Sequence, residues 1–235
     1  MKKIFLTLLT LVSLTHAQNI YATFDVAAQK SANLAFTASG IVTKVNVDIG
    51  SVVSKDQTLA SLDNSDIKAM LQKTQIVFKF ASRELKRQEK IKKLIDASKY
   101  DKVLSNYENA KASVAYQQAL YEKTILKAPF DGIIYDKAIE VGDAVSGMML
   151  KTVFKIQSLH KRKLILEFDQ KYHNVVKVGQ TFEYKVDGDD RTYKGVISKV
   201  YPYANFNNRK IKAEVKAKDF TVGLFGDGMI IVDGK

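Results

Sequence analysis

The sequence contains no cysteine among its 235 residues, and this absence excludes several kinds of chemistry. No disulfide, thiolate metal ligand or cysteine nucleophile is possible. A lipid anchor on an N-terminal cysteine is excluded as well. Histidine is scarce too: only His160 and His173 follow the first 17 residues, and no carboxylates cluster with them. We therefore expect no metal centre, no cofactor and no catalytic site.

Long apolar runs are also missing, with one exception near the N-terminus. A run of about 11 apolar residues, 4–14, follows Lys2 and Lys3 and precedes the small residue Ala17. A membrane-spanning helix needs about 20 apolar residues, so this run is too short to be one. The pattern predicts a signal peptide over residues 1–17, cleaved after Ala17, and export of the mature chain. An uncleaved anchor is the alternative.

Negative charge is in the minority, because 37 lysines and arginines give the chain a net charge of +12. A basic chain suits nucleic acid, anionic lipid headgroups or an acidic protein partner. Export argues against nucleic acid. Solubility alone would also account for many of the lysines.

Glycine and proline are absent from residues 65–124, and this stretch reads as helix. Apolar or small residues recur there at alternating spacings of three and four, the heptad pattern of a packed helical seam. Asp63–Asp66 can cap the first helix, whose first turn would begin near Ile67. A break near Asp96–Ser98, where Asp96 and Ser98 can cap the second helix, would make an antiparallel hairpin about 40 Å long. Such a rod has too little core for a catalytic domain, so its tip should carry its function.

Two β segments on either side of this stretch repeat one another. Gly40 precedes Gly50 by ten residues, just as Gly132 precedes Gly142 by ten. Val53-Ser54 and Val145-Ser146 then follow at the same offset. An internal repeat that is split by helices predicts two half-units that close into one compact β-domain.

The rest of the chain again alternates in the manner of strands. Five segments from residue 164 to 232, together with residues 20–26, predict a small barrel, with a short helix over 169–178 between Asp169 and Gly179. We therefore expect an α+β, mainly β fold in an elongated, multi-domain chain. Its parts would be a signal peptide over 1–17, a split β-domain over 31–64 and 125–158, a helical hairpin over 65–124, and a β-barrel over 18–30 and 159–235.

Specific residues in the two half-units carry a resemblance to a known family. The run Ala128-Pro129-Phe130-Asp131-Gly132 after a helix, and the segment from Ser39 to Asp63, resemble the lipoyl-like halves of periplasmic adaptors. These adaptors, also called membrane fusion proteins, belong to Gram-negative tripartite efflux pumps. The resemblance covers nearly the whole mature chain.

The resemblance implies a function that is not enzymatic. The chain would lie in the periplasm, peripheral to the inner membrane, and would bridge an inner-membrane transporter to a TolC-like outer-membrane channel. An RND-type transporter that exports drugs or toxic compounds is favoured, and an ABC-type exporter is the alternative. The assembly would be a hexamer or a trimer of dimers, without nucleic acid.

The resemblance also implies which residues meet the channel. Family members carry at the hairpin tip an arginine, a leucine four residues later and a serine seven beyond that. Arg87, Ile91 and Ser98 stand at these spacings, and we expect them to meet at the end of the rod. Leu94 would add to the apolar tip. The tip is also rich in lysine, which would favour an acidic channel end.

The chain departs from the family in two places. Asp56 stands where glycine is usual, which predicts a less tight turn. The sequence stops at Lys235 just after the barrel, so the resemblance implies that the membrane-proximal domain of longer members is missing or reduced to remnants.

Two rival functions follow from the same residues. One is a lipoyl or biotinyl carrier domain, for which Asp136-Lys137-Ala138 looks like a modification tripeptide. Lys137 lies inside the second half-unit, however, not at the junction between the halves. The other rival is an envelope scaffold. A soft metal such as copper(I) could bind Met148 and Met149, although core packing or a loop contact is the simpler expectation for them.

Overall fold

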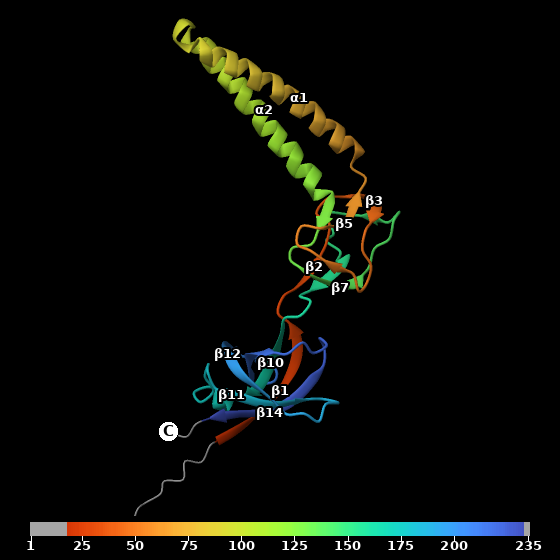
Figure 1. Cartoon of the computed structure of the whole chain (residues 1–235), viewed down its shortest axis with the longest axis vertical. Coiled ribbons are helices and arrows are strands. Elements are labelled where there is room, and N and C mark those ends of the chain that lie inside the picture. Colours follow the sequence, from red (N-terminus) through yellow and green to blue (C-terminus); the bar gives the residue numbers. More distant parts are fainter. Residues whose placement is uncertain (1–17, 233–235) are drawn as a thin grey trace, which may run out of the picture. The chain divides into compact units, whose positions relative to one another are not determined.

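A computed structural model describes residues 18–232, which fold into two compact units (Figure 1). One unit consists of residues 18–29 and 160–232, and the other runs from Lys30 to Leu159. The signal peptide expected over residues 1–17 lies outside the described residues. Within residues 18–232, neither long helix has the apolar length that a membrane crossing requires.

The first unit is a closed barrel of six antiparallel strands, as the sequence predicted. Buried and more exposed residues alternate along β1, so Ile20, Ala22, Phe24 and Val26 face the interior. There they pack against the inward-facing residues of the other strands. In order around the barrel the strands are β1 (Gln18–Ala28), β10 (Arg162–Asp169), β13 (Lys210–Ala217), β12 (Tyr193–Ala204), β11 (Thr181–Val186) and β14 (Phe225–Val232).

The short helix expected over residues 169–178 is reduced to one 3-10 turn, η2 (Gln170–Tyr172). Asp169 caps this turn as expected, because its Oδ1 accepts a hydrogen bond from the Lys171 amide at 2.9 Å. The chain that follows forms non-helical turns, in which the Val175 and Val176 amides both donate to the Tyr172 carbonyl, at 2.9 and 3.0 Å. The Gln180 side chain donates to the Val175 carbonyl at 2.9 Å and accepts from the Lys177 amide at 2.8 Å. These contacts satisfy backbone groups of the segment without a helix.

The second unit contains two four-stranded sheets that enclose a second core. Its fully buried residues come from both halves of the repeat and include Leu59, Leu62, Ile134 and Ile156. One sheet has the order β2 (Ser31–Leu34), β9 (Phe154–Gln157), β7 (Gly132–Lys137), β4 (Val52–Val53), and the other has the order β6 (Ile125–Lys127), β5 (Thr58–Leu62), β3 (Gly40–Val45), β8 (Ala144–Val145).

The predicted internal repeat is confirmed by reciprocal hydrogen bonds between the halves. The Gly50 amide donates to the Ile134 carbonyl at 2.8 Å, and the Gly142 amide donates to the equivalent Val42 carbonyl at 2.9 Å. Both glycines have a positive φ, +86° and +97°, which explains why this residue type recurs at the two turns. The shortest strand of each half also pairs with a strand of the other half: β4 of the first half pairs with β7, and β8 of the second half pairs with β3.

The less tight turn expected at Asp56, where the resemblance implies glycine, is not found, because the Gln57 amide closes the turn onto the Ser54 carbonyl at 3.1 Å. The φ of Asp56 is +65°, and aspartate is one of the few other residues that tolerate this left-handed region. The Asp56 amide donates to the Ala128 carbonyl at 2.8 Å. The turn is therefore held against the second half of the repeat.

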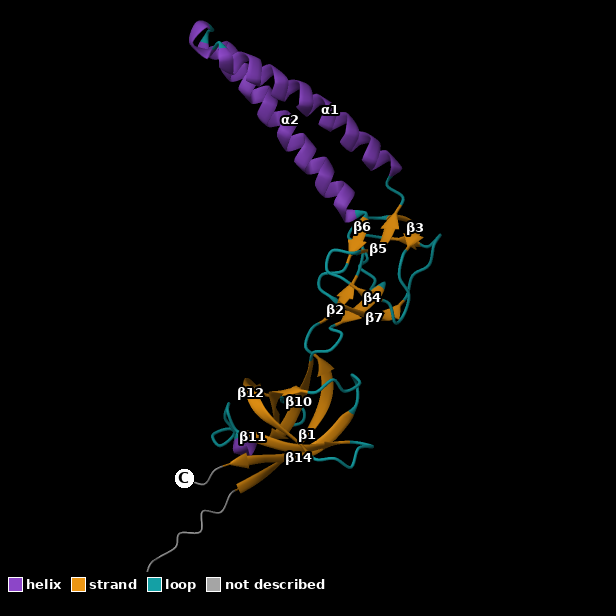
Figure 2. Cartoon of the chain, in the orientation of Figure 1, coloured by secondary structure: helices purple, strands orange, loops and turns teal. Residues whose placement is uncertain are grey.

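Two long helices form the insertion that the sequence predicted, α1 (Ser65–Lys90) and α2 (Ala97–Lys123). They run antiparallel and lie between β5 and β6 in the chain (Figure 2). The rings of Phe78 and Tyr107 meet across the pair with centroids 5.4 Å apart. Only three helical residues are buried: Leu71, Leu85 and Ala110. The pair thus has little core of its own, as its composition indicated.

The base of the helical pair is fixed by polar contacts, among them a cap from Asp63, which belongs to the segment expected to cap the first helix. α1 begins at Ser65, two residues before Ile67, and the side chain of its N-cap Asn64 makes no capping hydrogen bond. Asp63 instead accepts from the Ser65 amide at 3.2 Å and hydroxyl at 2.8 Å. Asn64 is drawn toward α2, where its Nδ2 donates to the Thr124 hydroxyl at 3.1 Å. The two helix ends are therefore tied together at the sandwich.

Candidate functional site

The four residues predicted to act together lie where the two helices meet, within residues 87–98, which we term the tip segment (Figure 1). The tip segment comprises the last turn of α1, the connection over residues 91–96 and the first two residues of α2. α1 ends at Lys90, and the Ile91 amide folds back to the Gln88 carbonyl at 3.1 Å. A 3-10 turn, η1 (Lys92–Leu94), follows, and Ile95 is extended. Two successive tight turns therefore reverse the chain without glycine or proline.

Asp96 immediately precedes α2 and caps it, as predicted. Its Oδ1 accepts a hydrogen bond from the Ser98 amide at 2.8 Å, and its carbonyl accepts from the Tyr100 amide at 3.2 Å. Hydrogen bonds from Ser98 and from the Lys99 amide hold the pKa of the Asp96 carboxyl below its ordinary value. Ser98 is not the cap itself. It is the second residue of α2 and is exposed.

Replacing Asp96 with alanine should fray the first turn of α2. The amides that the cap satisfies would then exchange severalfold faster, as measured by hydrogen exchange with mass spectrometry. Asp96→Asn is the matched control, because asparagine caps equally well without charge. The pKa of the Asp96 carboxyl is lower in the folded chain than in the unfolded chain. The stability that the carboxylate contributes is therefore complete above its ordinary pKa, and it is lost as the pH falls through the lowered pKa of the folded chain. Protection in the alanine variant equal to that of the native chain would contradict the assignment.

The apolar residues of the tip segment are presented to solvent. Leu94 is 85% exposed and Ile91 is 42% exposed. Ile91 is therefore not a seam residue buried between the helices. Two exposed aliphatic side chains three residues apart on a tight turn form a small apolar surface that a partner could cover.

Arg87 is engaged with its own helix. Its Nε donates to Glu84 Oε2 at 3.1 Å, and an Nη atom also contacts that oxygen. The side-chain Nε2 of Gln88 donates to Glu84 Oε1 at 2.7 Å. The hydrogen bond from Gln88, followed by that from Arg87, lowers the pKa of the Glu84 carboxyl. Arg87 remains 66% exposed. No hydrogen bond or ion pair among residues 18–232 joins Arg87 to Ile91 or Ser98, so the residues share a segment without forming a polar cluster.

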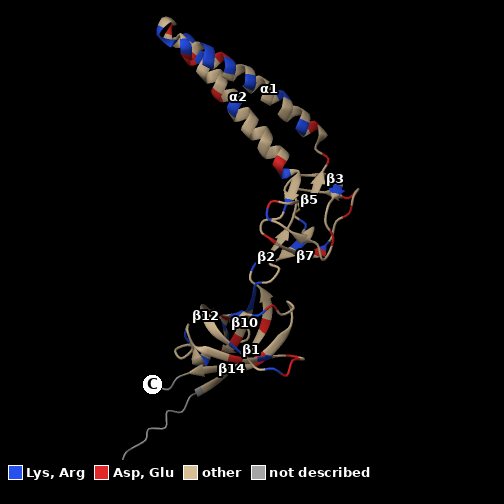
Figure 3. Cartoon of the chain, in the orientation of Figure 1, with Lys and Arg blue, Asp and Glu red and all other residues tan. Residues whose placement is uncertain are grey.

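Positive charge surrounds the tip segment, as expected (Figure 3). One lysine has a role that the sequence does not reveal, because Lys92 Nζ lies 4.3 Å from the centre of the Tyr100 ring. This cation–π contact crosses the turn and links η1 to α2. The other basic side chains there are Lys86, Lys90, Lys93 and Lys99.

A second surface on the helical pair is missed by the heptad pattern. Ile76, Val77 and Phe80 of α1 lie off the predicted seam and are 54–60% exposed. They line a groove of about 740 Å³, which also borders Val103 and Ala110 of α2. An apolar triplet outside the seam is a signal that sequence reasoning could have used.

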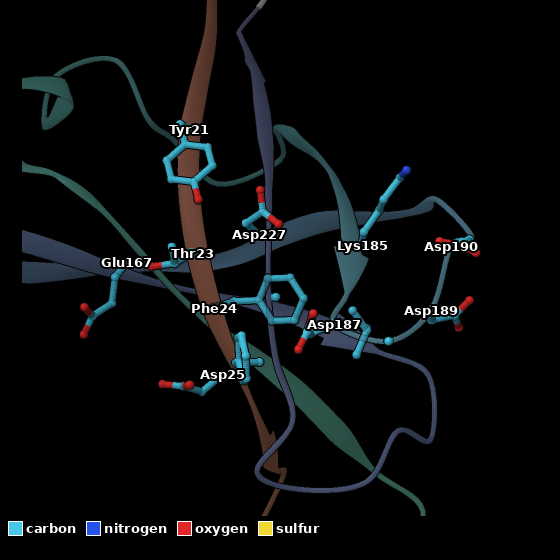
Figure 4. A pocket seen from close by; sticks show the side chains of 14 residues that line it. Tyr21, Thr23, Phe24, Asp25, Glu167, Lys185, Asp187, Asp189, Asp190 and Asp227 are labelled. Carbon is cyan, nitrogen blue, oxygen red and sulfur yellow. The ribbon is translucent and has the colours of Figure 1, made fainter.

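The barrel carries an acidic cavity of about 600 Å³, lined from β1, β11 and β14 (Figure 4). Asp25, Asp187 and Asp227 border it together with Phe24. Their carboxylates are spread around the cavity and do not converge on one point (Figure 4). Within residues 18–232 no group of histidine and acidic side chains is arranged to hold a metal ion.

Lys137, the candidate lysine for lipoyl or biotinyl modification, is held by two carboxylates. Its Nζ lies 2.7 Å from Glu140 and 3.4 Å from Asp48, and its side chain is only 15% exposed. The hydrogen bond to Glu140, with a contribution from Asp48, raises the pKa of Lys137. A paired, charged amine at the end of β7 differs from the free lysine that a swinging arm requires.

Met148 and Met149 are not core residues, so the expectation of core packing is wrong. They are 93% and 79% exposed, and Leu150 beside them is 67% exposed. The loop that carries them joins two short strands of different sheets, β8 and β9, which leaves its side chains outside the sandwich.

Comparison with known proteins gives one family and a set of similar folds. The model of the CzcB-like, barrel-sandwich hybrid domain matches residues 30–157, more than half of the chain. No curated protein matches the sequence.

Three solved structures illustrate the similarity in fold. A MacA–MexA chimera containing the Pseudomonas aeruginosa MexA α-hairpin domain is 20% identical, with a TM-score of 0.83 over 92% of this chain and 79% of that one. The membrane fusion protein Spr0693 from Streptococcus pneumoniae R6 is 15% identical, with a TM-score of 0.73 over 92% and 100%. A putative efflux transporter from Bacteroides eggerthii is 19% identical, with a TM-score of 0.67 over 92% and 70%.

Proposed function

Because this chain belongs to the CzcB-like barrel-sandwich hybrid family of membrane fusion adaptors, which are not enzymes, we propose that it bridges an inner-membrane efflux transporter to a TolC-like outer-membrane channel. The transporter would be of the RND type, with an ABC-type exporter as the alternative. The chain would work in the periplasm, peripheral to the inner membrane, in the export of drugs or toxic compounds. Its exposed, tightly turned tip segment is the observation that carries this proposal.

The tip segment suits a channel contact for three physical reasons. Leu94 and Ile91 offer apolar side chains that gain free energy when a partner covers them. The surrounding lysines would attract an acidic channel end and accelerate association at low salt. Arg87 and Ser98 are exposed at its borders, although they do not contact one another through polar atoms.

The groove lined by Ile76, Val77 and Phe80 supports self-association of the adaptor. Exposed apolar side chains along a helical pair with little core of its own gain stability when a second copy covers them. A ring of six copies, or three pairs, would repeat this contact. Many weak tip contacts would then act together as one avid site.

A photo-crosslinking amino acid at position 94 tests the proposal in cells. We expect it to capture an outer-membrane channel protein, because Leu94 is the most exposed apolar residue of the tip segment. The same group at Val178, which is 62% exposed on the barrel unit, is the matched control and should not capture the channel. Chemical crosslinking followed by purification should also recover a transporter, and its class would decide between RND and ABC partners.

Absence of any channel adduct at position 94, in cells that transport normally, would contradict the tip assignment. An envelope scaffold would yield neither transporter nor channel. A carrier domain would show a lipoyl or biotinyl addition in the intact mass of the mature chain, which the ion pairs of Lys137 argue against.

A further inference from the structure

The turn between β12 and β13 presents an aromatic side chain almost completely to water. Phe206 is 99% exposed, and Tyr203, three residues earlier, is 58% exposed. Single exposed apolar side chains are common, but this short segment exposes two aromatic rings, whose burial against a partner would gain free energy. We call residues 202–209 the aromatic turn.

The aromatic turn is rigidly built. The Arg209 amide donates to the Asn205 carbonyl at 2.8 Å, and the Asn205 amide donates to the Lys210 carbonyl at 2.9 Å. The Asn205 side chain accepts from the Asn207 amide at 2.8 Å. Arg209 takes the left-handed conformation, with φ at +53°, to close the loop. Phe206 is thus displayed on a fixed support, which lowers the entropy lost when it binds.

The strand register places this turn at one end of the barrel. β10 begins at Arg162, which pairs with Ala217, next to the segment that leads to the other unit. It ends at Asp169, which pairs with Lys210 beside the aromatic turn. The turn therefore extends from the barrel end that is farthest along the strands from the connecting segment.

Positive charge accompanies the exposed ring. Residues 202–210 contain Arg209 and Lys210 and no acidic residue. Two carboxylates border the turn. Glu167 faces Lys212 at 3.3 Å and Lys210 at 3.8 Å, so much of its charge is balanced. Asp169, the strand partner of Lys210, caps η2. Lys171 and Tyr203 line an adjacent cavity of about 610 Å³, which continues the same aromatic and cationic surface.

We propose that the aromatic turn docks onto an anionic lipid bilayer, with the rings of Phe206 and Tyr203 among the headgroups and with Arg209 and Lys171 against their phosphates. Aromatic rings prefer this zone of a membrane, and each nearby cation adds attraction to an anionic leaflet. The exposed apolar surface consists of two rings separated by polar residues, which is small for a stable protein interface but sufficient for a peripheral membrane contact.

Vesicle flotation of the purified mature chain tests this inference. We expect binding to phosphatidylcholine vesicles that contain phosphatidylglycerol, weaker binding to phosphatidylcholine alone, and release by salt. Phe206→Ser should weaken binding about tenfold or more, and Arg209→Ser about fivefold on the anionic vesicles only. The matched control is Tyr116→Ser, since Tyr116 is 62% exposed but lies on α2, outside the groove of the helical pair.

The absence of tryptophan from the sequence permits a second, direct measurement. In Phe206→Trp the single indole should shift its fluorescence to shorter wavelength when anionic vesicles are added, whereas Tyr116→Trp should not shift. An unshifted spectrum at position 206, or an equal loss of binding in Phe206→Ser and Tyr116→Ser, would overturn the proposal. If Phe206→Ser impaired transport in cells while the chain bound no vesicle, the turn would contact a protein instead. The vesicle assay contains no transporter or channel, so its failure leaves the adaptor function standing.

Discussion

Replacing Ile91 with aspartate is expected to abolish transport while the chain still folds and accumulates normally. The proposed channel contact buries the aliphatic surface of the tip segment, and a carboxylate in its place would be desolvated without a partner. Loss of a central interface residue costs on the order of 2 kcal/mol or more, about 30-fold in affinity for each adaptor. In a ring of adaptors that loss is repeated in every copy, so the assembled contact should fail completely.

The fold should survive this substitution because of where Ile91 lies. Its side chain is 42% exposed, and its only described polar contacts are backbone hydrogen bonds at the end of α1. A negative charge at a helix C-terminus is unfavourable by a few tenths of a kcal/mol up to about 1 kcal/mol, which is small beside the stability of the unit. Unchanged abundance and far-UV circular dichroism would verify this point.

Two controls make the experiment specific to the tip. Ile91→Leu restores the residue that the family resemblance implies and should keep transport, since the two side chains are nearly isosteric. Ile49→Asp introduces the same charge at a 61% exposed isoleucine in the sandwich and should leave transport unaffected. Charge reversal at Arg87 should act in the same direction as Ile91→Asp. Efflux at the native rate in the Ile91→Asp variant would refute the tip assignment.

Features that depend on local sequence periodicity could be predicted. The equal spacing of Gly40–Gly50 and Gly132–Gly142 predicted the two interlocked halves, because positive φ at equivalent turns demands glycine twice. The absence of glycine and proline from residues 65–124, with its heptad seam, likewise predicted α1 and α2. Asp96 was found as a cap because capping depends on contacts only two residues away.

Features that depend on the conformations of individual side chains could not be predicted. The helix expected after Asp169 gives way to turns, where the Gln180 side chain bonds to the backbone of Val175 and Lys177. Arg87 could be placed at the tip by spacing, but its pairing with Glu84 rather than with other tip residues depends on side-chain geometry. The exposure of Phe206 could not be predicted from the alternation of apolar and polar residues, because that pattern tells which face of a sheet a strand residue occupies and does not apply to a turn. The sequence thus predicted that the residues of the tip segment lie near the ends of the two helices, but not which contacts their side chains make.

Replacing Gly226 with alanine is expected to destabilise the barrel strongly, although it adds only one methyl group. Gly226 lies in β14 between two neighbours, opposite Phe24 of β1 and Val186 of β11. A Cβ there would overlap the Lys185 carbonyl oxygen and would lie 2.6 Å from Cζ of the Phe24 ring. Its φ is not positive, so this glycine is required for space and not for a left-handed backbone.

The clash cannot be relieved cheaply, because both obstructing groups are fixed. The Lys185 carbonyl belongs to the β11–β14 pairing that closes the barrel. The Phe24 ring is 3% exposed and stands edge-on to Phe182 and Tyr184, with centroids 5.9 and 5.3 Å away. Moving either group breaks strand pairing or core packing. We therefore expect a loss of about 3 kcal/mol, which for a unit of this size lowers its melting temperature by roughly 15 °C.

The near-UV circular dichroism of tyrosine measures this change within the barrel, because Tyr184 and Tyr193 stack in its core with centroids 5.6 Å apart. A probe of the barrel is needed since the two units can unfold separately. Gly188→Ala is the matched control: Gly188 has a φ of +80° but open space around it, so alanine costs only about 1 kcal/mol of backbone strain. If Gly226→Ala melted no lower than Gly188→Ala, β14 would have to shift freely against Phe24. The remaining strand pairs would then be sufficient to close the barrel, without the close approach of β14 and β1 at this glycine.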